Sequence, residues 1–92
     1  MPANDGAADA DLIPLETWLA RLREAAASPR DLTLTTRERG ALLELARLAA
    51  HTSERVAAPL STFMAGVAAA DLSAEERLTL VERLTASLTP RP

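Results

Sequence analysis

The sequence predicts an all-α fold: a compact four-helix bundle-like domain over residues 12–90, preceded by a flexible tail over residues 1–11. The chain has 92 residues, of which 48% are hydrophobic and 25% charged, and this composition suits one globular domain. Apolar residues recur three and four positions apart in four segments, which is the spacing of one helix face. Aromatic residues make up only 2% and cysteine is absent, so the core must be built from Leu, Ala and Val without disulfides.

The tail contains small and acidic residues and no large apolar side chain after Met1. It cannot bury enough surface to offset the entropy of ordering, so we expect it to be flexible. It has no basic residue and no apolar run, so we expect no secretory signal peptide. No stretch of eighteen apolar residues occurs, so we expect no membrane span and a cytoplasmic protein.

The first helix is predicted from Leu12 or Pro14 to Ala27. Proline suits the first turn of a helix, where its missing N–H would have no partner in any case. Ser28 precedes Pro29 and is therefore disfavoured in the helical conformation, which ends the segment. The apolar stripe of this helix consists of Leu15, Trp18, Leu19, Leu22 and Ala26.

The second helix is predicted to open at Thr35, because Glu38 follows at the spacing of a capping box. It should end near His51 or Ser53, and its apolar residues cover an arc broad enough to contact two neighbours. In the connector before it, we expect Leu32 and Leu34 to anchor to the core.

The third helix is predicted from Pro59 to Ala70. Its residues are small or apolar on every side and none is charged, which is typical of a buried central helix. We expect its large side chains to lie in the core; they are Leu60, Phe63, Met64 and Val67.

The fourth helix should begin after Ser73, which forms a second capping-box pattern with Glu76, and should end before Pro90. Its predicted buried stripe consists of Leu78, Val81, Leu84 and Leu88.

The residues that could perform chemistry are few, and we expect a protein that is not an enzyme and holds no metal or cofactor. His51 is the only histidine, and no glycine-rich phosphate loop or nucleophile motif is present. The formal net charge is −3, and all ten basic residues are Arg spread over several segments. A nucleic-acid-binding protein would carry a basic stripe, so we expect no nucleic-acid partner.

One connector could bind an anion or dock a partner: it joins the second helix to the third and brings together His51, Arg55, Ser61 and Thr62. The free N–H groups at a helix N-terminus, an arginine and two hydroxyls can hold a phosphate or a carboxylate. Alternatively, His51 bonds the carbonyls that end the second helix, Arg55 forms an ion pair, and the hydroxyls bond locally.

The two aromatic residues also have two interpretations. Their helical spacing within apolar stripes favours core packing for both Trp18 and Phe63. A half-exposed Trp18 would instead mark a binding face, because tryptophan is enriched at binding hot spots. A core with only two aromatic residues supplies little stability to a chain this short, so homo-oligomer formation or docking on a partner is plausible.

Three segments resemble an uncharacterised bacterial family of small helical domains. They are residues 15–19 (LETWL), 42–51 (LLELARLAAH) and 55–68 (RVAAPLSTFMAGVA), with Val56 where the family usually has proline. Members of that family are encoded beside or fused to molybdenum-cofactor guanylyltransferase, and also near formate-dehydrogenase-like molybdoenzymes. The resemblance implies a role in cofactor maturation or molybdoenzyme assembly, with one of these proteins as partner.

Three functions therefore remain open from the sequence. The first is a non-catalytic accessory or protein-interaction domain of the molybdenum-cofactor pathway. The second is a self-associating structural domain. The third is a domain that binds a phosphate-bearing ligand at the N-terminus of the third helix.

Overall fold

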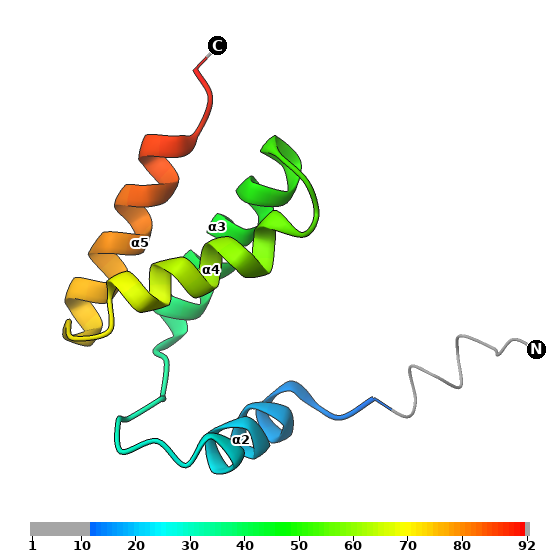
Figure 1. Ribbon diagram of the computed structural model, residues 1–92, viewed down its shortest axis with the longest axis vertical. Helices are drawn as coiled ribbons and strands as arrows, with labels where there is room; N and C mark the ends of the chain where they lie inside the picture. The colour runs from blue at the N-terminus through cyan, green and yellow to red at the C-terminus, as the bar shows by residue number, and fades with distance from the viewer. Residues whose placement is uncertain (1–11, 92) are drawn as a thin grey trace, which may run out of the picture. The chain divides into compact units, whose positions relative to one another are not determined.

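The computed structural model describes residues 12–91, and these residues form four helices (Figure 1). The helices are α2 (Leu15–Ala26), α3 (Thr36–Thr52), α4 (Ala57–Ala68) and α5 (Ala74–Leu88). No strand occurs within 12–91, so the predicted all-α class with four helices is confirmed. The predicted tail, residues 1–11, lies outside the described residues. The chain divides at residue 33 into two units, the first containing α2 and the second α3, α4 and α5.

Helix α2 follows the prediction closely. It begins after Pro14, whose carbonyl accepts a hydrogen bond from the Trp18 N–H at 3.0 Å. It ends because Ala27 adopts a left-handed conformation with φ 48°, from which its N–H donates to the Arg23 carbonyl. No residue of α2 is buried within the first unit, and Leu32 in the following connector is also exposed there, so the anchoring of Leu32 to the core stays a prediction.

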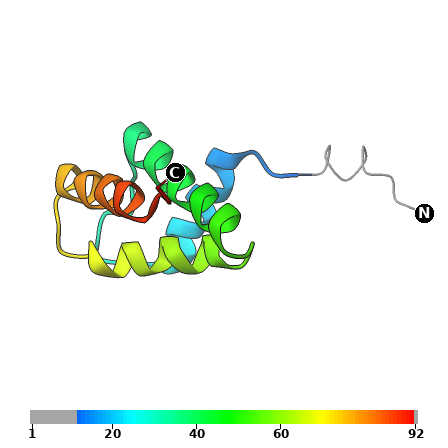
Figure 2. The same cartoon turned by 90° about the horizontal axis from the view of Figure 1, so that it is seen from above.

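Helix α3 is the centre of the second unit and packs against both α4 and α5 (Figure 2). Its predicted start is confirmed, since the Thr35 hydroxyl accepts from the Glu38 N–H and the Glu38 carboxylate accepts from the Thr35 N–H. The prediction of two neighbours for this helix is also confirmed. The core joins one buried side chain from each helix, namely Leu45, Ala65 and Val81.

Helix α4 departs from the sequence prediction in two ways. It starts at Ala57 rather than Pro59, because the turn is already formed by the Ala57 N–H donating to the Glu54 carbonyl at 2.9 Å. Proline is tolerated here because it lies in the first turn, where its N–H is not needed. The prediction of a helix buried on every side is wrong, because only one face of α4 packs against the unit.

Helix α5 begins after Ser73, where both hydrogen bonds of the predicted capping box with Glu76 are present. Val81 is buried, and Leu78 and Leu84 are half-buried, as expected for the inner stripe. Leu88 is exposed, contrary to prediction, because it lies in the last turn, beyond the half-buried part of the helix.

Candidate functional site

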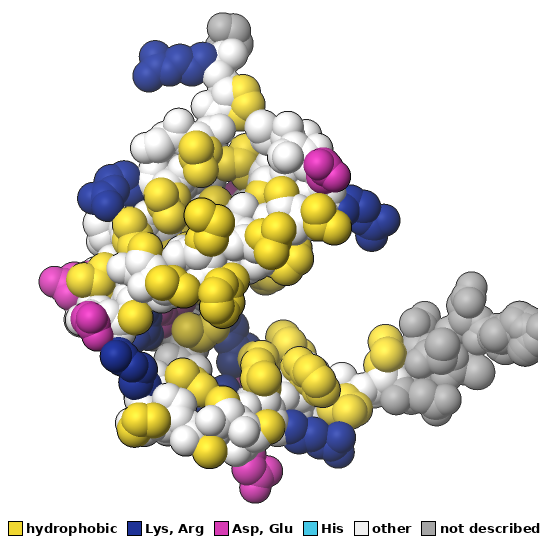
Figure 3. Space-filling view, viewed as in Figure 1, with side chains coloured by type: hydrophobic (Ala, Val, Ile, Leu, Met, Phe, Trp, Pro, Cys, Tyr) yellow, Lys and Arg dark blue, Asp and Glu magenta, His cyan; other side chains and the backbone are white. Residues whose placement is uncertain are grey.

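Four large apolar side chains form a continuous stripe on the outer face of α4. They occupy positions i, i+3, i+4 and i+7 of the helix, so they point to the same side. Phe63 is 72% exposed, and the other three are exposed to a similar degree. We name this surface the α4 stripe; it consists of Leu60, Phe63, Met64 and Val67. Figure 3 shows hydrophobic side chains gathered along this helix.

The opposite face of α4 explains why the large residues point outward. Ala65 is only 3% exposed, Ala69 is buried, and Ala58 is half-buried on the same side. Small side chains allow two helix backbones to approach closely, and a larger side chain at these positions would hold α4 away from α3. The expected core positions of all four stripe residues are therefore wrong, including the interpretation of Phe63 as a core aromatic.

No charged side chain occurs between Ala57 and Ala68. Charged groups flank the stripe instead: Glu54 and Arg55 precede the helix and Asp71 follows it, and all three are exposed. Gly66 leaves the backbone open beside the stripe, since a Cβ atom there would have no neighbour within 4 Å. An uncharged apolar surface of this kind is well suited to contact another apolar surface.

The four residues of the predicted anion or docking site lie around the connection between α3 and α4. His51 and Arg55 are exposed, the first in the last turn of α3 and the second before α4. Ser61 and Thr62 are half-buried in α4, one turn beyond its start. The Thr62 hydroxyl donates to the carbonyls of Ala58 at 3.2 Å and Pro59 at 3.1 Å, so it bonds locally. Anion binding at this connector stays a prediction.

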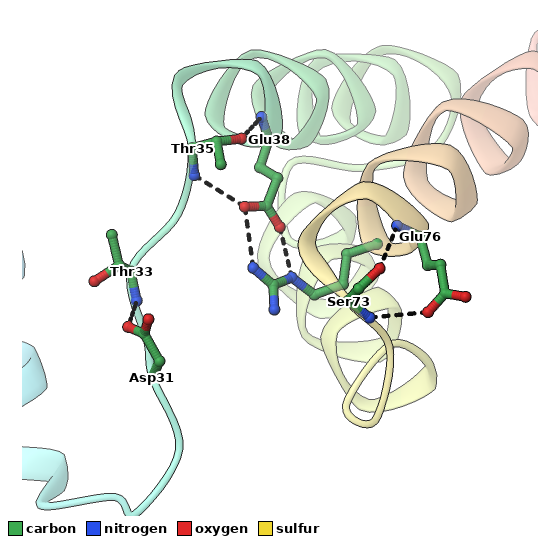
Figure 4. Close-up of polar contacts among 7 residues, drawn as sticks. Asp31, Thr33, Thr35, Glu38, Ser73 and Glu76 are labelled. Carbon is green, nitrogen blue, oxygen red and sulfur yellow. Dashed lines mark hydrogen bonds and ion pairs between the residues drawn. The ribbon is translucent and has the colours of Figure 1, made fainter.

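The sequence does not predict the ion pair that joins buried Glu38 of α3 to half-buried Arg77 of α5. Glu38 is only 4% exposed, and Arg77 donates to both of its carboxylate oxygens, from Nε at 2.5 Å and from Nη2 at 3.0 Å (Figure 4). The same carboxylate also caps α3 through Thr35. The sequence predicts only the capping role of Glu38, because nothing in local spacing indicates a partner 39 positions away.

The Arg77 hydrogen bonds lower the pKa of Glu38 below its ordinary value, and they outweigh burial, which acts in the opposite direction. Glu38 therefore stays ionised and bound, which suits a structural carboxylate rather than a proton donor. A cavity beside this pair has a volume of about 80 Å³ and is lined in part by Leu42 and Leu78. Ligand pockets usually measure about 300–1,000 Å³, so this cavity is too small to hold a substrate.

The first unit carries a second exposed apolar stripe. On α2, Leu15, Trp18 and Leu22 lie three and four positions apart, and Trp18 is 52% exposed. Core packing of Trp18 is therefore not observed within the first unit, and a binding face at Trp18 stays a prediction.

Within residues 12–91, no group of three or more histidine, aspartate or glutamate side chains is arranged to hold a metal ion. The helices of this part of the chain are also too short or too polar to cross a membrane.

Fold and surface together define a small all-α domain with exposed apolar helix faces. The chain belongs to the DUF6457 family, a domain of unknown function whose family model matches residues 11–91. The match confirms an uncharacterised domain family, and it extends through α5, further than the segments that carried the resemblance. No curated protein and no solved structure matches the chain.

Proposed function

We propose that this chain is a non-catalytic protein-interaction domain that assists molybdenum-cofactor maturation or the assembly of a formate-dehydrogenase-like molybdoenzyme. The observation that supports the interaction role is that many more large hydrophobic side chains are exposed than buried. Among residues 12–91, thirteen large hydrophobic side chains are exposed, whereas Leu45 and Val81 are the large ones that are buried. Where such side chains form a contiguous surface, as in the stripes of α2 and α4, they are typical of an interaction surface in a soluble protein.

The non-catalytic part of the proposal is supported by the state of the buried carboxylate. Glu38 accepts hydrogen bonds from Arg77 and from the Thr35 backbone, so its oxygens already have partners. A catalytic acid or base must be able to reach a reacting proton, which this arrangement does not allow.

The molybdenum-cofactor part is supported by the resemblance of residues 15–19, 42–51 and 55–68 to domains encoded beside the guanylyltransferase of that pathway. We place the partner contact on α2, where Trp18 is flanked by Leu15 and Leu22. Tryptophan supplies a large contact area with few rotatable bonds, which makes it a common anchor of interfaces.

The test measures binding of the purified chain to the guanylyltransferase and to the molybdoenzyme of the same host. We expect the wild type to bind one of them and Trp18→Ser to weaken that binding at least about tenfold, the usual size of a hot-spot loss. Leu88→Ser is the matched control, because Leu88 is equally exposed but lies outside both stripes. The absence of binding to either protein contradicts the proposal.

A further inference from the structure

We draw no further inference here: the strongest candidate, the exposed apolar stripe on the outer face of α4, carries none, because nothing in the structure shows what covers it.

Discussion

The two faces of α4 are both apolar, but one is buried against the rest of the unit and the other is exposed. The inner face carries Ala58, Ala65 and Ala69 against the rest of the unit, while the outer face carries Phe63 and Met64 in the open. Hydrophobicity alone would bury the larger side chains, because they remove more apolar surface from water. The comparison shows that side-chain size decided which face was buried, since only the small residues allow close approach to α3.

The largest expected effect comes from placing a charge on the inner face. Ala65→Glu should lower the free energy of unfolding by at least about 3 kcal/mol, because it buries a carboxylate without a partner and overfills a closely packed site. Ala68→Glu, three residues further on the exposed side of the same helix, should change it by less than about 0.5 kcal/mol. Urea unfolding followed by circular dichroism measures both, and equal losses would contradict the assignment of the two faces.

A smaller effect is expected from the ion pairs that join α3 to α5. Arg77→Ala removes the partner of the buried Glu38 and should cost about 3 kcal/mol, because it leaves a buried carboxylate unpaired. Arg37→Ala is the matched control: Arg37 pairs with Glu82 across the same two helices, but the two side chains are 78% and 55% exposed. An exposed pair contributes only about 0–1 kcal/mol. A similar cost for both variants in urea unfolding would show that Glu38 is not effectively buried.

The same pair predicts a dependence on pH. The pKa of Glu38 is lower in the folded than in the unfolded chain, so its contribution to stability is fully present above the ordinary pKa of a glutamate. That contribution should be lost as the pH falls through the lowered folded value. Unfolding curves recorded between neutral pH and about pH 3 should show the wild type approaching the stability of Arg77→Ala. A constant difference between the two proteins would contradict this assignment.

The smallest expected effect concerns the start of α4. The Thr62 hydroxyl donates within its own helix, and Ser61 is half-buried, so only the exposed Arg55 and His51 are fully available to an anion. We therefore expect excess inorganic phosphate to raise the melting temperature of the wild type very little. A clear rise in the wild type that is absent from Arg55→Ala would establish the predicted anion site instead.

Helix positions could be predicted because their signals are local. Thr35 and Ser73 each lie three residues before a glutamate, and each pair forms both bonds of a capping box. A hydroxyl and a carboxylate at this spacing satisfy N–H groups within one turn, whatever the rest of the chain does. The broad apolar arc of α3 predicted two neighbours for the same reason: helical periodicity fixes which residues share a face.

The candidate site could be predicted only in part. The sequence directed attention to the connector before α4 and to Trp18, but it placed the residues of the α4 stripe in the core. The large residues of this helix do have helical spacing, but its opposite face is apolar as well, so the spacing does not show which of the two faces is buried.

The sequence by itself determined the all-α class, the helix starts at Thr36 and Ala74, and the lack of cysteine chemistry, because these depend on composition and on contacts within one turn. Only the tertiary structure decided which face of α4 is exposed and which arginine binds Glu38. Those outcomes depend on how closely helices approach one another and on a contact between residues 39 positions apart, and neither quantity is encoded in local spacing.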